Sequence, residues 1–148
     1  MTVDTPRLTK LITAASPATK DHLVRILERD ASDRAWAAQI GPALTQADVA
    51  RLLGVSVQAV SKNRSLLRIS NRDGRVVYPV VQFDGRSPLK GVAEVLAVLD
   101  GPLLPLTVAS WLTSSKTDLG GRTAIEALHD GDREQVLLLA RQSADSAA

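Results

Sequence analysis

The chain contains no cysteine and very few aromatic residues. Without cysteine it can form neither a disulfide framework nor a zinc finger, and it has no thiol nucleophile. Aromatic residues make up 3% of the 148 residues, whereas hydrophobic residues as a whole make up 45%. The core must therefore consist mainly of leucine, valine, alanine and isoleucine. This composition favours packed helices over a β-sandwich, and we predict a mainly α fold.

Long apolar runs are also missing. No stretch approaches the roughly 18 apolar residues that a membrane-spanning helix needs. The first residues do not show the charged-then-apolar pattern of a secretory leader. We therefore expect a soluble cytoplasmic protein without a membrane partner.

The usual patterns of catalytic residues are absent as well. The only histidines are His22 and His129, which lie far apart in the sequence. The chain has no phosphate-binding loop, no HxxxH pair, no dinucleotide fingerprint and no EF-hand. Asp130 and Asp132 flank Gly131, and helix capping explains these acids better than metal binding. We expect no enzymatic activity, no cofactor and no metal.

Residues 44–64, LTQADVARLLGVSVQAVSKNR, predict a helix-turn-helix. Thr45 and Asp48 have the spacing of a capping box at the start of the first helix. Gly54 can adopt the left-handed backbone conformation that a short turn requires, and Ser56 can cap the second helix. Two short amphipathic helices packed together without function are the alternative. The fixed order of capping box, glycine and second cap argues against it.

The second helix is expected to present a polar, basic face to the major groove. Val55 is expected to fill the corner between the helices, and Val60 to be buried. Asn63 stands where such helices usually bury an aliphatic residue, so we expect the second helix to end near Arg64. The residues predicted to contact DNA are Gln46, Ser56, Gln58, Ser61, Lys62, Arg64, Ser65, Arg68, Arg72 and Arg75.

The net charge of +2 conceals an asymmetry along the chain. Residues 1–87 carry 13 Lys/Arg and 8 Asp/Glu, whereas residues 88–148 carry 5 and 8. The phosphate backbone of DNA attracts the basic residues 1–87, whereas the acidic residues 88–148 are a poor place for DNA to bind. The basic excess coincides with the predicted helix-turn-helix, which supports DNA as a partner.

Apolar spacing predicts three short helices before the helix-turn-helix. The first covers residues 8–15, the second runs from Ser16 to about Glu28, and the third runs from Ser32 to residue 40. Trp36, on the third helix, could anchor an interface, but core packing is the favoured interpretation.

After the helix-turn-helix the period changes to that of strands. Residues 67–70 and 76–83 predict a two-stranded wing, with Asp73 and Gly74 in its turn. Pro79 cannot donate a ladder hydrogen bond, so its strand is expected at an edge. The wing carries three arginines: Arg68, Arg72 and Arg75. They either contact DNA phosphates or keep an exposed strand edge soluble, and the adjoining helix-turn-helix favours phosphate contacts.

The rest of the chain predicts a separate helical unit. Residues 84–88, DGRSP, are interpreted as a linker, and four amphipathic helices follow it. Residues 143–148 are small and polar and are expected to form a free tail. We therefore predict two domains, residues 1–84 for DNA binding and residues 85–148 as a small helical bundle.

Residues 36–142 resemble bacterial antitoxins with the Xre/MbcA/ParS toxin-binding domain. Three stretches carry the resemblance: GPALTQADVARLLGVSVQAVSK, RVVYPVVQFDGRSPLKGVAEVLAVL and WLTSSKTDLGGRTAIEALHDGDREQVLLLA. The chain departs from the family at Ala124, where proline is usual, and between Lys62 and Leu66, where it is shorter.

The resemblance implies an antitoxin that represses its own operon and neutralises a toxin, here a RES-type enzyme that consumes NAD. It also implies toxin binding by the C-terminal half. From the position of the tail after the last helix, we expect it to enter the active-site cleft of the toxin, where its terminal carboxylate would compete with the phosphates of NAD. A tail without a role is the alternative. The residues assigned to toxin binding are Trp111, Leu119, Gly121, Arg122, Glu126, Arg133, Arg141 and Ala148.

A different class of function stays open. The chain could be a stand-alone repressor, phage-type or excisionase-like, whose C-terminal bundle only forms the dimer. The expected partners are operator DNA, a cognate toxin and a second copy of the chain. A small-molecule pocket is disfavoured because the predicted helices are short.

Overall fold

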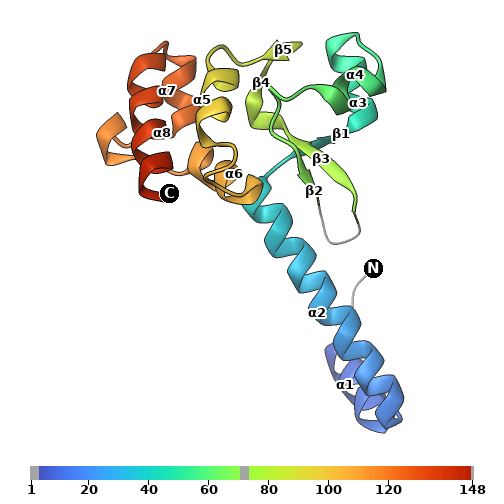
Figure 1. The fold of residues 1–148 in the computed structure, drawn as a ribbon. Helices are drawn as coiled ribbons and strands as arrows, with labels where there is room; N and C mark the ends of the chain where they lie inside the picture. The colour runs from blue at the N-terminus through green and yellow to red at the C-terminus, as the bar shows by residue number, and fades with distance from the viewer. Residues whose placement is uncertain (1–3, 71–73, 148) are drawn as a thin grey trace. The chain divides into compact units, whose positions relative to one another are not determined.

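The computed structural model describes residues 4–70 and 74–147 (Figure 1). Eight α-helices and two small antiparallel sheets lie within these ranges, and the mainly α fold is confirmed. The chain divides into two compact units, residues 1–38 and residues 39–148. This division precedes Gln39, whereas the sequence suggested a boundary after residue 84.

The first unit consists of α1 (Thr5–Ala14) and most of α2 (Pro17–Ile40). Asp4 caps α1 by accepting a hydrogen bond from the backbone N–H of Arg7 at 3.4 Å. The prediction of separate second and third helices is wrong, because α2 is one helix of 24 residues. Residues 29–32 contain neither glycine nor proline, so nothing in them stops the helix. The side chain of Trp36 lies outside the described part of the structure.

The second unit contains the helix-turn-helix, α3 (Gln46–Leu53) and α4 (Val57–Lys62). The predicted capping box is confirmed: the backbone N–H of Asp48 donates to Thr45 Oγ1 at 3.2 Å, and that of Thr45 donates to Asp48 Oδ2 at 3.3 Å. Gly54 ends α3 with φ of 69°. The expectation that Val55 fills the corner is wrong, because its side chain is 45% exposed.

The core beneath the two helices joins the helix-turn-helix to the strands that follow it. It consists of a cluster of buried residues that is completed by a tyrosine from a strand: Val49, Ala50, Val60, Leu66 and Tyr78. Leu53, rather than Val55, is the partly buried residue near the turn that packs against this cluster. Burial of Val60 was predicted and is confirmed.

The sheet next to the helix-turn-helix has the order β1-β3-β2. β2 (Ile69–Ser70) and β3 (Val76–Pro79) form the predicted hairpin, with Ile69 opposite Val77. The predicted turn lies largely at residues 71–73, outside the described residues. The sequence did not reveal β1 (Ala43–Thr45), which pairs antiparallel with the other side of β3.

The prediction of an edge strand for Pro79 is wrong, because β3 is the central strand. Proline is tolerated there because it is the last residue of β3. It lies opposite Ala43 of β1, whereas the pairing with β2 extends no further than Val77. The missing N–H of Pro79 therefore interrupts no hydrogen-bond ladder between β3 and β2.

The predicted linker forms a second small hairpin instead. β4 (Phe83–Asp84) pairs with β5 (Ser87–Pro88) directly after the 3₁₀-helix η1 (Val80–Gln82). The backbone N–H of Leu89 then donates to the carbonyl oxygen of Gln82 at 2.7 Å. Residues 84–88 are therefore folded against their neighbours rather than free between two domains.

The four predicted C-terminal helices are confirmed as α5 (Val92–Leu99), α6 (Pro105–Thr113), α7 (Ala124–His129) and α8 (Arg133–Ala147), with the 3₁₀-helix η2 (Thr117–Leu119) before α7. α8 packs against both α5 and α7 (Figure 1). The bundle has a core of fully buried side chains: Val92, Val95, Leu99, Leu112 and Val136.

The expectation of a free tail is wrong for the described residues, because α8 continues through Ala147. Two contacts hold this end of the helix. Ala144 is buried, and Ser143 Oγ accepts a hydrogen bond from Trp111 Nε1 at 2.9 Å. Ala148, with the terminal carboxylate, lies outside the described residues.

Candidate nucleic-acid interface

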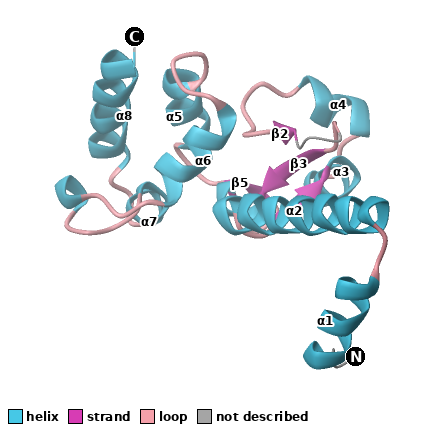
Figure 2. Ribbon diagram, turned by 90° about the horizontal axis from the view of Figure 1, so that it is seen from below, coloured by secondary structure: helices cyan, strands magenta, loops and turns pink. Residues whose placement is uncertain are grey.

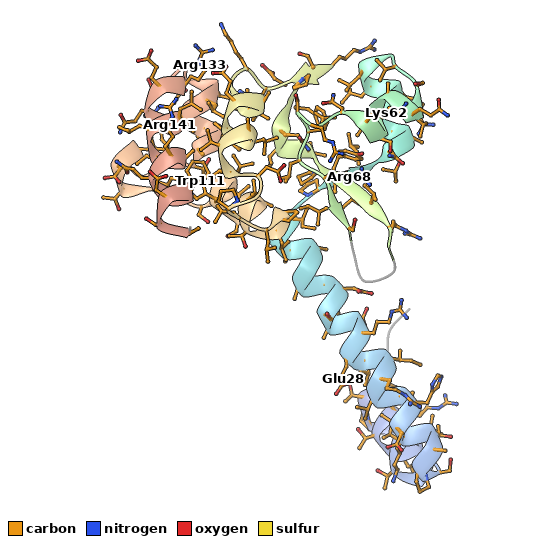
Figure 3. The ribbon with its side chains drawn as sticks, viewed as in Figure 1. Glu28, Lys62, Arg68, Trp111, Arg133 and Arg141 are labelled. Atoms are coloured by element: carbon orange, nitrogen blue, oxygen red, sulfur yellow. The ribbon has the colours of Figure 1, made fainter. Side chains whose placement is uncertain are left out.

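α4 presents the exposed face that the sequence predicted. Ser56 Oγ caps the helix by accepting a hydrogen bond from the backbone N–H of Ala59 at 3.1 Å. Buried Val60 fixes which side of the helix faces the core. Gln58, Ser61 and Lys62 are exposed, and Figure 3 labels Lys62 on α4. This face offers an amide, a hydroxyl and a cation, which are groups that read base edges or contact phosphates.

Asn63 explains why the recognition helix is short. Asn63 follows the last residue of α4 in an extended conformation, with φ of −76° and ψ of 111°. Its side-chain oxygen accepts a hydrogen bond from the backbone N–H of Ser65 at 2.8 Å, so that the chain turns there. The helix therefore ends at Lys62, close to the predicted end near Arg64.

Arg68 joins the recognition helix from the segment before β2. Its Nη1 donates a hydrogen bond to the carbonyl oxygen of Ser61 at 3.2 Å. A cation at a helix C-terminus interacts favourably with the partial negative charge there. The contact therefore brings an exposed arginine to the C-terminal end of α4, the helix that also carries Lys62. Figure 3 labels both Lys62 and Arg68.

Gln82 is a positioning residue that the sequence analysis missed. Its side chain is completely buried. Oε1 accepts from the backbone N–H of Leu67 at 2.7 Å, and Nε2 donates to the carbonyl oxygens of Leu67 at 2.9 Å and Pro79 at 3.1 Å. The side chain thus holds the backbone between α4 and β2, which carries Arg64 and Arg68. A lone polar residue in the apolar run VVYPVVQF was the available signal.

The charge around this site is strongly positive. Residues 43–87 carry seven Lys/Arg and three Asp/Glu. Asp48 is the acid of α3, and its pKa is lowered by the hydrogen bonds with the side chain and backbone of Thr45 and by Arg51. Asp48 and Arg51 also form an ion pair. The other predicted DNA contacts lie on separate elements: Gln46 and Ser56 begin α3 and precede α4, Arg75 precedes β3, and Arg72 lies outside the described residues.

Several residues assigned to toxin binding instead stabilise the C-terminal bundle. Leu119 is 2% exposed, so the prediction that it contacts a partner is wrong. Trp111 is partly buried and holds Ser143 of α8, with the Lys116 ammonium 4.2 Å from the centre of its ring. Burial lowers the pKa of Lys116. Gly121 lies in the turn before α7, with φ of 85°.

The charged residues of this signature also have partners within the fold. Arg122 pairs with Asp130 at 2.9 Å and with Asp132 at 2.7 Å, and the hydrogen bonds that it donates to these carboxylates raise the pKa of its guanidinium. Glu126 and Thr123 form a capping box. The backbone N–H of Thr123 donates to Glu126 Oε1 at 2.9 Å, and that of Glu126 donates to Thr123 Oγ1 at 3.1 Å. The capping box stabilises the start of α7, and the ion pairs of Arg122 with Asp130 and Asp132 link the turn before α7 to the turn after it.

Arg133 and Arg141 lie on α8 (Figure 3). Arg133 Nη1 contacts Glu94 Oε1 of α5 at 3.0 Å. Both arginines are exposed, and Arg141 lines the same shallow depression as Arg133, Glu134 and Leu138. Among the predicted toxin contacts with charged side chains, Glu126, Arg133 and Arg141 are exposed, whereas Arg122 is half-buried.

Residues 4–70 and 74–147 contain neither a candidate metal site nor a candidate membrane-spanning helix. No group of three or more His, Cys, Asp and Glu side chains there could hold a metal ion. No helix in those ranges combines the length and apolar character required to cross a membrane.

Comparison with known proteins supports the fold but does not give a family. No protein-family model matches the chain, and no curated protein matches it. A similar solved structure is the NMR structure of Rv2175c, with a TM-score of 0.60 and 26% sequence identity. The match covers 70% of this chain and 81% of that chain.

Proposed function

We propose that the chain is a sequence-specific DNA-binding protein that inserts α4 into the major groove. The observation that carries this proposal is the exposed polar face of α4, capped at its start by Ser56 and joined at its end to Arg68. In helix-turn-helix proteins the second helix reads base edges in this way.

The side chains of α4 suggest a division of roles. Gln58 has the amide that pairs well with adenine, and Lys62 has the donor that pairs well with guanine. Arg64 and Arg68 follow the helix and supply cations for phosphates beside the groove. The phosphate contacts of Arg64 and Arg68 set the affinity and its salt dependence. The base contacts of Gln58 and Lys62 set which sequence is bound.

Replacing both Gln58 and Lys62 by alanine should weaken binding to a duplex that the full-length chain enriches from a random-sequence DNA pool. Loss of base contacts costs about 1–3 kcal/mol each, which predicts a rise in Kd of at least about tenfold. Fluorescence anisotropy at several salt concentrations measures the change. Arg141→Ala removes one positive charge from α8 and is the matched control, with an expected change of less than about twofold.

Two results would contradict the proposal. One is failure of the chain to enrich any sequence from the pool. The other is equal affinity of wild type and the Gln58→Ala, Lys62→Ala variant for the enriched duplex. Arg68→Ala separates the two roles, because removal of a phosphate contact should reduce the salt slope by about one and leave the sequence preference unchanged.

We further propose, from the resemblance to Xre/MbcA/ParS antitoxins, that the chain neutralises a toxin of the RES type and represses its own operon. The observation that favours a protein partner is the exposed face of α8. Leu138 is 47% exposed there and lies one turn from Glu134 and from Arg141. An exposed apolar side chain between opposite charges is typical of a protein-binding surface.

Co-expression of the chain with the product of a neighbouring gene tests the antitoxin role. We expect a copurifying partner, lost in a Leu138→Asp, Arg141→Glu variant and retained in Leu104→Asp, which alters an exposed leucine outside α8. No copurification by wild type would favour the alternative, a stand-alone repressor. Residues 143–147 belong to α8, so they do not form a free tail that could enter a cleft of the toxin.

A further inference from the structure

The first unit exposes apolar side chains that nothing in the described structure covers. Among the residues of 4–38 whose side chains are described, none is buried. Several large apolar side chains there are about half exposed or more: Leu8, Leu11, Val24, Ile26 and Leu27. Figure 2 shows α1 turning away from α2 instead of lying along it. A helix of ten residues is marginal in water without packing, so this unit needs a partner surface.

The middle of α2 is self-complementary when it is read against itself in reverse. Residues 20–30 are KDHLVRILERD, and Arg25 stands at their centre. In reverse register Leu23 lies opposite Leu27, Val24 opposite Ile26, and Lys20 opposite Asp30. Asp21 likewise lies opposite Arg29, which has the opposite charge, and His22 lies opposite Glu28, which can accept a hydrogen bond from it.

Helical periodicity places the matching residues on one face. At 100° per residue, Leu23 and Leu27 lie about 160° from Arg25, and Lys20 and Asp30 lie about 140° from it. Val24 and Ile26 flank this face. Arg25 therefore points away from this face. In the reverse register Arg25 would lie opposite Arg25 of the second helix, but its place on the far side keeps the two like charges apart.

We propose that α2 pairs antiparallel with α2 of a second copy of the chain, about a two-fold axis at Arg25. Leu23 packs against Leu27 of the second copy, with Val24 and Ile26 at the sides. Lys20 pairs with Asp30 of the second copy at each end. Asp30 already accepts a hydrogen bond from Arg34 through Oδ2, and its other oxygen can accept from Lys20.

The pattern selects a second copy of this chain and the antiparallel direction. A parallel pair would place Lys20 opposite Lys20 and Asp30 opposite Asp30, which is destabilising. An unrelated partner would not account for the match of the sequence with its own reverse. Closed two-fold pairing is also the commonest symmetry of homo-oligomers. The proposed dimer contact thus lies in the first unit, whereas the stand-alone repressor alternative placed it in the C-terminal bundle.

The dimer goes beyond the proposed function and is measured without DNA. Sedimentation velocity of the full-length chain over a range of concentrations should show a reversible monomer-dimer equilibrium. Leu27→Lys should raise the dissociation constant at least a hundredfold, because it places a charge in the apolar centre. Arg25→Glu alters the opposite face and is the matched control, with an expected change of less than about twofold. Circular dichroism establishes that each variant remains helical.

Charge reversal tests the direction of pairing. Lys20→Glu and Asp30→Lys should each weaken the dimer about tenfold, because each places like charges opposite one another at both ends. An equimolar mixture of the two variants should form a heterodimer of wild-type strength, since Glu and Lys then meet across the axis. A parallel pair would behave differently. Its wild-type form already places like charges opposite one another, so neither single variant would weaken it and the mixture would associate more strongly than wild type.

Each contrary result overturns the proposal. A monomer at all concentrations, or a dimer that Leu27→Lys leaves intact, shows that α2 is not the interface. Absence of heterodimer in the mixture shows that the register is wrong. Because DNA binding by α4 is measured separately, a monomer that still reads its duplex would reject this dimer and leave the proposed function standing.

Discussion

Replacement of Gln82 by leucine should lower the free energy of unfolding by about 2–5 kcal/mol. Leucine has a similar volume, but it leaves the N–H and carbonyl of Leu67 without the partners they have at 2.7 and 2.9 Å. A buried backbone group that loses its partner costs about 1–3 kcal/mol. Urea unfolding followed by circular dichroism measures the loss, and Gln135→Leu at an exposed position of α8 is the matched control.

The same variant should also weaken DNA binding, because Gln82 holds the segment that carries Arg64 and Arg68. Gln82→Glu separates hydrogen bonding from size. It keeps an acceptor for the Leu67 N–H but sets a carboxylate against the carbonyl oxygens of Leu67 and Pro79. We expect it to be no more stable than the leucine variant at neutral pH. Wild-type stability in both variants would mean that the amide contributes nothing to the fold.

Replacement of Gly91 by alanine should destabilise the second unit by about 2–4 kcal/mol. Gly91 precedes α5 with φ of 93°, a conformation that costs a residue with a Cβ roughly 1–2 kcal/mol. An added Cβ would also lie 2.9 Å from Leu128 Cδ2 and 3.1 Å from Arg133 Cγ. Overpacking of this kind costs about 1–3 kcal/mol. Thermal and urea unfolding measure the sum.

Gly101→Ala is the control that isolates the clash. Gly101 has a nearly identical φ of 96°, but nothing lies within 4 Å of an added Cβ. Only the backbone cost should therefore remain. Equal destabilisation of the two variants would show that the clash at Gly91 contributes nothing to the loss of stability. The side chains of Leu128 and Arg133 would then have moved away from the added Cβ.

The parts of the fold that the sequence predicted are those encoded locally. Thr45, Asp48 and Gly54 define the start and end of α3 through contacts within a few residues. The four helices of the C-terminal bundle follow from apolar spacing in the same way. A local pattern of this kind carries its own geometry, so that it can be recognised without knowledge of what packs against it.

The parts that were missed depend on contacts between distant segments. β1 is three residues long and owes its conformation to β3, so its own residues give no strand pattern. Gln82 became interpretable only when its partner Leu67 was known. The small, polar residues of the tail predict a free segment, yet the contact with Trp111 and the burial of Ala144 keep it helical. The exposed face of α4 was predicted correctly, whereas the assignment of Leu119 to a toxin contact does not fit its burial.

The pairing of β1 with β3 has a consequence for synthesis on the ribosome. β1 and both helices of the helix-turn-helix leave the ribosome before the strand that completes their sheet, because Ala43 and Leu44 pair with Pro79 and Tyr78. Tyr78 is also part of their core. The nascent recognition helix therefore lacks its full support until β3 has emerged. A messenger truncated before that point would yield a chain that contains every predicted base-reading residue but cannot hold them in place.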